Sequence, residues 1–553
     1  MAHFFLCIIA VLLLVGVAPS NPETAPIEVR VDAKPTLPLS KINPGIYGIG
    51  TYFGERKNDL ETWGLNPQVF RLGGNASERF NWKTNSWNTG KDWYFRNFNS
   101  STPAVIDFFM KNNRDHGVGS LITIPMLGWI AKDQTSGSYP VSKYPNQKKQ
   151  LEGFGNGRTK DGDPIKADPN LANTPLTSEY ISSWVSHLKT QFGNHPHRYI
   201  IGNEPMLWHE THQDVHPTRA TYDEVLNKFI STARLVRKAD PDAVIFGPAL
   251  WGYLAVKQSA FDAPGPWSQG QRHSDKKKHG GVDFLEWFLK EVTKEEMRTG
   301  ESLLNVVDVH YYPEGDHVRS SSASPSISRQ ARLEATRSLW DPSYKDPSWI
   351  DEEIYFIPYI KGIIAKTNPK LKFAIGEYKF YGEEDIAGGI ALAEVLGIFS
   401  KEKLDYASYW TIPPPKSPAS FAFKLFRNYD GKGSSFGDIL IPNTYGIHKD
   451  ASIFSALREA DQTITLVMLN KSQTKTAAFD LNFSGLDEKT SITLYKFNPT
   501  SRAIEPTSLA SLKTQPSLPP LSMALLEIKR VKNQLQKKSG KKETLDQGEA
   551  KNL

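Results

Sequence analysis

Eight short apolar runs, alternating with longer stretches of helical spacing, constrain the fold of this chain most strongly. The runs are rich in Val, Ile and aromatic residues, and they lie at 46–50, 69–74, 121–127, 199–204, 244–249, 306–312, 373–378 and 406–411. Apolar residues recur at helical spacing between them, at 180–192, 222–238, 284–297 and 386–399. Because alternating strands and helices give a parallel sheet that eight units can close, the pattern predicts an α/β fold, a (β/α)8 TIM barrel.

Polar and aromatic residues gather where these runs end, at positions that a strand interior would not select. They are Asn75 after the second run, Trp129 after the third, Asn203 and Glu204 in the fourth, His310 and Tyr312 in the sixth, Glu377 and Tyr378 in the seventh, and Trp410 in the eighth. The C-terminal ends of barrel strands carry the active site in this architecture, so these residues predict one shared site.

A second pattern begins near residue 440, where helical spacing gives way to alternating apolar and polar residues. Alternation at 463–469, 477–483, 491–497 and 523–528 predicts a C-terminal antiparallel β-sandwich, to which Ile27, Val29 and Val31 add a strand. We therefore expect a signal peptide at 1–20, an N-terminal segment at 21–43 that contributes a strand to the sandwich, a catalytic barrel at 44–439, a β-sandwich at 440–530, and a basic disordered tail at 531–553.

The N-terminal residues predict export. Residues 4–18 are nearly all apolar, and Ala18 and Ser20 are the small residues that signal peptidase recognises. The run is shorter than the ~20 residues of a membrane-spanning helix, so we favour a cleaved signal peptide over an anchor and expect a secreted, extracellular protein. Cys7, the only cysteine, lies inside it, so the mature chain is expected to have no disulfide and no thiolate metal site. Asn-x-Ser acceptor sites for glycosylation stand at Asn75, Asn99, Asn470 and Asn482, of which Asn75 is expected to face the cleft.

Positive charge is concentrated at the C-terminus. The formal net charge is +6, and the stretch after residue 528 holds eight Lys or Arg against three acidic residues. The rest of the chain is near neutral, which argues against a basic stripe for nucleic acid. We expect no nucleic-acid partner, no membrane contact after signal cleavage, and a monomer.

Two glutamates match the requirements of glycosidic bond cleavage, which needs one acid to protonate the leaving oxygen and one carboxylate across the anomeric carbon. Glu204 stands in Ile-Gly-Asn-Glu-Pro and Glu377 in Ala-Ile-Gly-Glu-Tyr, at the ends of the fourth and seventh runs. These strands stand nearly opposite in an eight-stranded ring, so both carboxylates are expected in one cleft with a polysaccharide as partner. The alternative is that each glutamate is a surface or salt-bridged residue.

Neighbouring side chains have both a supporting and a structural interpretation. Arg71 is placed to hold a nucleophile ionised, or to form a structural salt bridge. His310 and Tyr312 share one side of a strand and can reach the same carboxylate, or pack in the core. The Asn203 amide can bind a sugar hydroxyl.

Aromatic and histidine residues near the strand ends suggest two further interpretations, sugar stacking and metal binding. Flat rings stack on sugar faces, although any single ring is as readily part of the core; the rings are Trp129, Trp208, Trp251 and Trp410. His209, His212 and His216 lie close in sequence but lack the His-Glu-x-x-His spacing of a zinc hydrolase. We predict no catalytic metal and no required cofactor, and leave a structural calcium ion open.

With these motifs in view, the chain resembles glycoside hydrolase family 44. The resemblance runs from about residue 44 into the sandwich, and four motifs carry it: Phe-Arg-Leu-Gly-Gly-Asn-Ala-Ser-Glu-Arg-Phe-Asn-Trp at 70–82, Gly-Asn-Glu-Pro through Thr-His-Gln-Asp-Val-His-Pro at 202–217, Asp-Val-His-Tyr-Tyr-Pro at 308–313, and Gly-Glu-Tyr at 376–378. Lys379 and Phe380 follow the last motif where the family usually has an amide residue, which leaves the neighbouring subsite open. Lys379 lies on the same side of the strand as Glu377, where it can lower the pKa of the Glu377 carboxyl group or bind substrate.

The resemblance implies retaining endo-hydrolysis of β-1,4-glucans such as cellulose derivatives or xyloglucan. Glu204 would be the general acid/base and Glu377 the nucleophile, with carboxyl groups ~5 Å apart. The supporting or substrate-binding residues would be Arg71, Asn75, Trp129, Asn203, Trp208, His310, Tyr312, Tyr378 and Trp410. The alternatives are another retaining barrel glycosidase, such as a xylanase, mannanase or glycosylceramidase, and a non-catalytic carbohydrate-binding protein.

Overall fold

The computed structural model describes residues 26–33, 40–54, 59–193, 197–263, 274–319, 325–483, 490–511 and 515–530. The predicted signal peptide and basic tail lie outside these residues. Within the described part of the chain, no helix combines the length and apolar character that a membrane crossing requires.

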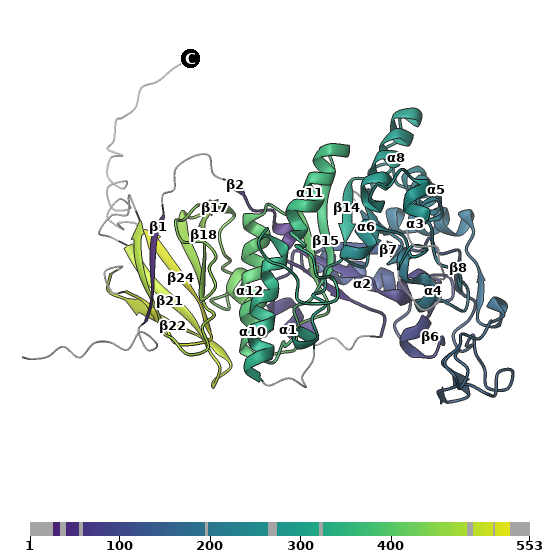
Figure 1. Ribbon diagram of the computed structural model, residues 1–553. Helices are drawn as coiled ribbons and strands as arrows, with labels where there is room; N and C mark the ends of the chain where they lie inside the picture. The colour runs from purple at the N-terminus through teal and green to yellow at the C-terminus, as the bar shows by residue number, and fades with distance from the viewer. Residues whose placement is uncertain are drawn as a thin grey trace, which may run out of the picture.

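Eight parallel strands close into a barrel, which forms the larger body in Figure 1. They are β3 (Gly48–Thr51), β4 (Val69–Leu72), β7 (Gly119–Ile124), β12 (Arg198–Ile201), β13 (Val244–Leu250), β14 (Val306–Val309), β15 (Lys372–Tyr378) and β16 (Tyr406–Tyr409). Each pairs with its sequence neighbour, and β16 closes the ring on β3. All eight predicted runs supply a strand, so the TIM-barrel prediction is confirmed.

Helices surround the barrel, and α5 shows why they form. The Thr221 hydroxyl accepts the N–H of Glu224 at its start, acidic residues fill the first turn, and basic residues fill the last. Val225, Phe229 and Val236 bury one face against the barrel. The principal helices are α2 (Val105–Asp115), α3 (Ser178–Phe192), α5 (Tyr222–Ala239), α8 (Phe284–Thr299), α10 (Pro325–Ala335), α11 (Phe356–Thr367), α12 (Ile386–Lys401) and α13 (Pro418–Arg427).

Fully or almost fully buried apolar side chains from six adjacent strands, β4, β7, β12, β13, β14 and β15, fill the barrel beneath the site. This layer consists of Val69, Leu121, Ile200, Phe246, Ala249, Val306 and Ala374. Because the layer excludes solvent, polar side chains above it at the strand ends can only face one another or the cleft.

A β-sandwich packs beside the barrel, on the left in Figure 1. Its larger sheet has the order β2 (Ser40–Lys41), β17 (Ile439–Ile441), β18 (Ala451–Arg458), β19 (Thr463–Asn470), β24 (Ser522–Arg530), β21 (Thr490–Asn498) and β22 (Ala503–Leu509), all antiparallel. The smaller sheet has the order β1 (Ile27–Ala33), β20 (Ala477–Phe483) and β23 (Ser517–Leu518). The N-terminal strand joins the sandwich as predicted, but it pairs parallel to β20, so the smaller sheet is mixed.

One predicted glycosylation site is closed by this packing. Asn470 is fully buried in the sandwich, where its amide donates to the carbonyl oxygens of Leu518 and Pro519 at 2.9 Å. A glycan on this nitrogen would have no room, so Asn470 is a structural residue.

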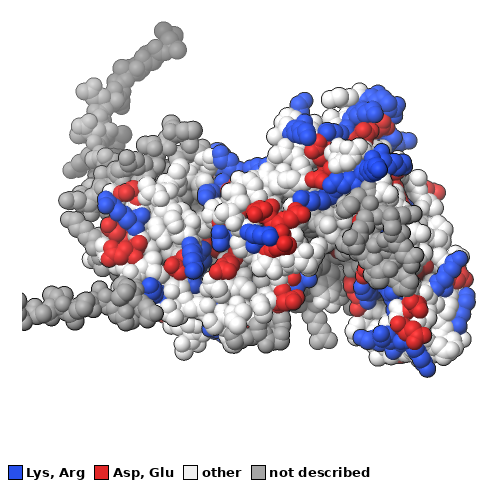
Figure 2. Space-filling view, in the orientation of Figure 1, with Lys and Arg blue, Asp and Glu red and all other residues white. Residues whose placement is uncertain are grey.

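Charged residues of both signs share the visible surface. Figure 2 shows Lys and Arg interspersed with Asp and Glu, with the basic residues most frequent over the barrel end that carries α5 and α8. Acidic partners stand among them: Arg234 Nε lies 2.9 Å from a Glu301 oxygen and Lys290 Nζ 2.5 Å from a Glu286 oxygen. This face is therefore mixed in charge.

The barrel and the sandwich are joined by a buried ion pair. Glu394, in the middle of α12, is fully buried and accepts hydrogen bonds from Lys471 Nζ at 2.5 Å and the Ser452 hydroxyl at 2.6 Å, both in the sandwich. Its other oxygen accepts from the Thr336 hydroxyl at 2.8 Å. All three donors point at one carboxylate, which fixes how the two bodies meet.

Replacing Glu394 by alanine is expected to destabilise the protein by about 3–5 kcal/mol, because it leaves the Lys471 charge buried without its anion. Urea unfolding followed by circular dichroism measures the loss. Asp115→Ala, which removes an exposed helical pair with Lys111, is the matched control and should leave the midpoint unchanged. Equal midpoints for wild type and the Glu394 variant would contradict this role.

Candidate active site

Glu377 points into the barrel from the end of β15, with its side chain only 6% exposed. One carboxylate oxygen forms an ion pair with Nη1 of Arg71, which is fully buried on β4. The other accepts a hydrogen bond from the Tyr312 hydroxyl at 2.8 Å and lies 3.6 Å from Nδ1 of His310. Arg71 thus forms an ion pair with the predicted nucleophile.

Glu204 follows β12 at a sharp corner of the backbone. Gly202 leaves the strand with φ 76°, and Glu204 itself adopts the left-handed conformation with φ 45° and ψ 55° before Pro205 starts a 3-10 turn, η5 (Pro205–Leu207). A carboxylate oxygen of Glu204 lies 2.9 Å from Nδ1 of His310. The corner aims the side chain into the barrel mouth instead of along the strand.

The two glutamates meet across a short gap. A carboxylate oxygen from each and a ring nitrogen of His310 all lie within 4.8 Å of one another. Among the described residues, no other set of three or more His, Cys, Asp and Glu side chains is as close. Because Arg71 already neutralises Glu377, this set has the charge pattern of an acid–base site rather than of an ion cage.

Burial and neighbouring charges shift the pKa values of Glu377, His310 and Tyr312 from their ordinary values. Burial by itself raises the pKa of Glu377, but the cations Arg71 and His310 and the hydrogen bonds from Arg71 and Tyr312 outweigh it, so its pKa lies below the ordinary value. Protonation therefore removes this anion only at a pH below the usual glutamate range. Burial lowers the pKa of His310, yet the Glu377 and Glu204 carboxylates raise it above its ordinary value. Burial first, and then Glu377, raise the pKa of Tyr312, which stays a hydrogen-bond donor.

A chain of side-chain contacts leads from Glu377 to the cleft rim. Nη2 of Arg71 lies 3.2 Å from Oδ1 of Asn203, and Nδ2 of Asn203 lies 3.5 Å from Oδ1 of Asn75. Nδ2 of Asn75 lies 3.1 and 3.2 Å from the two oxygens of Asp92. Both predicted asparagines therefore belong to the site.

A cleft of about 840 Å³ opens above both glutamates. Its walls carry aromatic rings and polar groups, which suit a neutral sugar chain. Side chains that line it beside the glutamates are Tyr52, Asn75, Asp92, Trp93, Lys379 and Trp410. Lys379 lies on the Glu377 side as predicted, where it forms an ion pair with Glu383.

The Trp410 ring is set against glycine backbone. Gly74, with φ 77°, faces the indole so closely that an added Cβ would lie 3.0 Å from a ring carbon. Arg71 lies over the same ring, with its Cζ 5.5 Å from the centroid. Trp410 therefore lines the cleft beside Glu377, and its role as a sugar platform stays a prediction.

Four predicted aromatic residues lie elsewhere. Trp208 is fully buried, with its indole N–H donating to the Asn203 carbonyl at 3.0 Å, so it supports the loop and offers no face to a ligand. Tyr378 is also fully buried, because strand alternation turns it outward against Phe399. Trp129 starts β8 (Trp129–Ala131) outside the cleft lining, and Trp251 lines a separate hollow of about 350 Å³.

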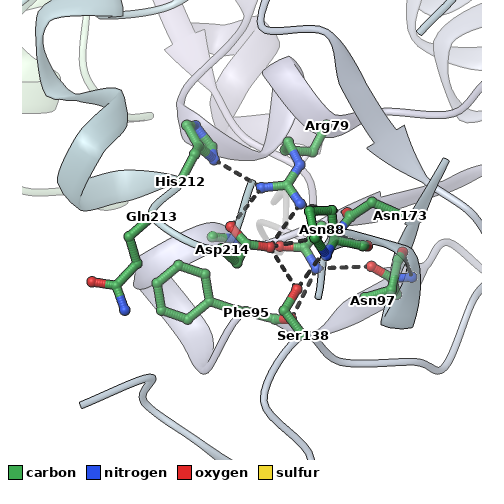
Figure 3. A network of polar contacts seen from close by, with 12 residues as sticks. Arg79, Asn88, Phe95, Asn97, Ser138, Asn173, His212, Gln213 and Asp214 are labelled. Carbon is green, nitrogen blue, oxygen red and sulfur yellow. Dashed lines mark hydrogen bonds and ion pairs between the residues drawn. The ribbon is translucent and has the colours of Figure 1, made fainter. Parts of the chain in front are cut away.

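A buried polar network, shown in Figure 3, ties together the loops on one side of the site. Arg79 and Asp214 form its centre, with Nη2 of Arg79 2.9 Å from an Asp214 oxygen and both side chains fully buried. The Ser138 hydroxyl and the Asn173 amide also contact Asp214. The network joins η2 (Asn75–Arg79) to the segment that follows Glu204.

The histidines of that segment have other partners. Nδ1 of His212 lies 3.3 Å from Nη1 of Arg79, and burial lowers the pKa of this ring well below its ordinary value. Nε2 of His216 lies 2.7 Å from a Glu224 oxygen. The His212 ring therefore belongs to the network and the His216 ring pairs with α5, and the absence of a catalytic metal stays a prediction.

Several cleft residues were not among the predicted ones. Tyr52 directly follows β3, so the strand-end rule applied to the first run would have found it. Asp92 and Trp93 lie in an insertion 20 residues beyond β4, where no local pattern marks them. Glu78, which is fully buried and lies outside the cleft lining, was not among the predicted residues either; it sits within one of the four motifs, but only the folded chain shows what it binds.

Two carboxylates at the mouth of a closed barrel, one paired with arginine and one beside histidine, are the arrangement of a glycoside hydrolase. Comparison with known proteins agrees. The profile of glycoside hydrolase family 44 matches residues 86–315. Endoglucanase A from Paenibacillus lautus is 30% identical over 536 residues, which cover 91% of this chain and 73% of that protein. The chain belongs to glycoside hydrolase family 44 and is a glycoside hydrolase.

Solved structures give the same assignment. A bifunctional glucanase–xylanase from a metagenome library superposes with a TM-score of 0.84 at 32% identity, over 91% of this chain and 99% of that one. A Paenibacillus polymyxa xyloglucanase of family 44 superposes with a TM-score of 0.74 at 26% identity, over 91% and 100%. The resemblance carried by the four motifs is confirmed.

Proposed function

We propose that this protein is a secreted, retaining endo-β-1,4-glucanase that acts on cellulose derivatives or xyloglucan. Glu377 is the nucleophile and Glu204 the general acid/base. The observation that carries the proposal is the gap of no more than 4.8 Å between oxygens of the two carboxylates. Retaining glycosidases hold these groups about 5–5.5 Å apart, whereas inverting enzymes need about 6.5–9.5 Å to admit a water molecule.

The environments of the two glutamates match these roles. Arg71 and Tyr312 hold Glu377 as an anion, so one of its oxygens can attack the anomeric carbon from the face opposite the leaving group. Glu204 gives its proton to the glycosidic oxygen, and the bond to the leaving chain breaks. Glu204 then takes a proton from water, whose oxygen displaces Glu377 and restores the original configuration.

Substrate class and location rest on other observations. The cleft offers Tyr52, Trp93 and Trp410 to sugar faces, and the relatives are named as an endoglucanase, a xyloglucanase and a glucanase–xylanase. Xylan is the second candidate, because the glucanase–xylanase superposes with a TM-score of 0.84, above the 0.74 of the xyloglucanase. Secretion rests on the apolar segment at 4–18. We propose a monomer that needs no cofactor.

Product analysis tests this function. The purified protein is incubated with carboxymethyl cellulose, xyloglucan, xylan and mannan, and released reducing ends are measured together with product size. We expect a rapid fall in the chain length of a β-1,4-glucan, and early proton NMR spectra in which the β-anomer of the new reducing end appears first. An α-anomer appearing first contradicts retention, and no release from any polymer contradicts the activity.

A further inference from the structure

Glu78 is a fully buried carboxylate that the reaction itself does not use. It lies in η2 and accepts three backbone hydrogen bonds. Oε1 accepts the N–H of Asn203 at 2.6 Å, and Oε2 accepts the N–H groups of Met126 at 2.9 Å and Leu127 at 3.2 Å. One side chain thus joins the segments that follow β7 and β12.

These bonds hold the corner from which Glu204 projects. Three consecutive N–H groups there have different acceptors: Gly202 donates to the carbonyl of Ile124 at 2.9 Å, Asn203 to Glu78, and Glu204 to the carbonyl of Ala249 at 3.0 Å. The left-handed backbone of Glu204 costs of the order of 1–3 kcal/mol, so neighbouring bonds must hold it. The middle bond of the three is the one that Glu78 accepts.

The corner is also shaped around the Glu78 side chain. A Cβ added at Gly202 would lie 2.8 Å from Oε1 of Glu78 and 2.7 Å from the terminal carbon of Met126. Glycine is therefore required at 202 both for its φ of 76° and for the space that the carboxylate occupies.

We propose that Glu78 is a positioning residue for the general acid/base, fixing the Asn203–Glu204 backbone so that the Glu204 carboxyl reaches the glycosidic oxygen. The inference rests on the proposed function of Glu204. A carboxylate accepts from all three N–H groups, whereas a glutamine amide would turn an NH2 group toward at least one of them. Burial raises the pKa of Glu78 to about 7, while the three N–H donors and the Lys228 cation favour its anion.

Leaving-group dependence separates positioning from general stability. Glu78→Gln is compared with wild type and Glu204→Ala on two aryl β-cellooligosides, one with 2,4-dinitrophenolate and one with phenolate as leaving group. A good leaving group departs without a proton, so we expect kcat/KM to fall about 10- to 100-fold for the phenyl substrate and no more than about threefold for the dinitrophenyl substrate. KM for carboxymethyl cellulose should change less than about twofold, because the cleft walls are untouched.

A matched control comes from the opposite end of the barrel. Glu296, beneath β14, accepts the N–H groups of Leu303 at 2.6 Å and Leu304 at 2.9 Å, so Glu296→Gln makes the same chemical change far from the cleft. It should lower kcat/KM for neither substrate. If Glu78→Gln does not fold, Glu78→Asp, which keeps the charge but shortens the side chain, is measured in the same way and should show the same leaving-group dependence.

The outcomes are distinguishable. Equal losses on both aryl substrates, or no loss on either, overturn the role of Glu78 when Glu204→Ala, relative to wild type, still shows the expected contrast, a much larger loss on the phenyl than on the dinitrophenyl substrate. Absence of that contrast in Glu204→Ala overturns the proposed acid/base itself, and an inactive wild type overturns the proposed function.

Discussion

Replacing Glu377 by glutamine is expected to lower kcat on soluble glucans by on the order of 10^5-fold or more, because the amide cannot attack the anomeric carbon. Binding should survive, since Gln has the same size and the rings of Trp410 and Tyr52 are unchanged. Reducing-sugar release measures the first effect, and affinity electrophoresis in xyloglucan or carboxymethyl cellulose gels measures the second.

A rescue experiment with azide tests whether Glu377 is the nucleophile, and not only whether activity is lost. In Glu377→Ala the anion can occupy the space of the missing carboxylate and attack an activated β-aryl glycoside from that side, which gives an α-glycosyl azide. Near-wild-type activity in Glu377→Gln rules out this residue as nucleophile, and a β-glycosyl azide from Glu377→Ala contradicts its placement opposite the leaving group.

Replacing Glu204 by alanine is expected to lower kcat/KM by about 10^2- to 10^4-fold on substrates with poor leaving groups, the usual contribution of general acid catalysis. With 2,4-dinitrophenyl substrates the first step should proceed, and the glycosyl-enzyme should accumulate because no base activates water. A burst of dinitrophenolate in stopped-flow absorbance measures this accumulation.

Azide again gives a distinct product. It should raise the turnover of Glu204→Ala by attacking the intermediate from the face that Glu204 occupied, so that a β-glycosyl azide forms. Glu296→Gln serves as the control and should show neither burst nor azide effect. If turnover of Glu204→Ala is independent of both leaving group and azide, another residue is the acid/base.

The barrel could be predicted because its strands are buried on both faces and therefore read as continuous apolar runs. The ends of the strands were predicted less accurately than the strands themselves. The run at 121–127 continues past the end of β7 at Ile124, because Pro125 has no N–H for the ladder while the following residues stay buried. The run at 199–204 likewise overshoots β12, because Gly202 turns out of the strand.

Residues of the candidate site could be predicted where the strand-end rule applies, as for Glu204 and Glu377. The rule does not show that Trp208 and Tyr378 are buried, because an aromatic residue near a strand end packs inward or outward according to neighbours that are distant in sequence. Glu78 lies in one of the four motifs, but nothing in the sequence indicates its role, because its partners are backbone N–H groups, which every residue carries.

The direction of β1 in the smaller sheet also could not be predicted from the sequence pattern. Alternation at 27–31 shows that one face of β1 is buried, which is the same for parallel and antiparallel pairing. The boundaries expected at residues 43 and 439 stay predictions, although β2 and β17 pair with each other in the larger sheet.

The chain from Asp92 through Asn75 and Asn203 to Arg71 has a single permitted direction. A carboxylate only accepts hydrogen bonds and a guanidinium only donates them. Each asparagine must therefore turn its oxygen toward the Arg71 end of the chain and its nitrogen toward the Asp92 end. Neither amide can flip without opposing two donors or two acceptors. A guanidinium in the barrel and a carboxylate at the rim thereby fix the orientation of both amides in the cleft wall, so a ligand meets their oxygen and nitrogen atoms in one arrangement only.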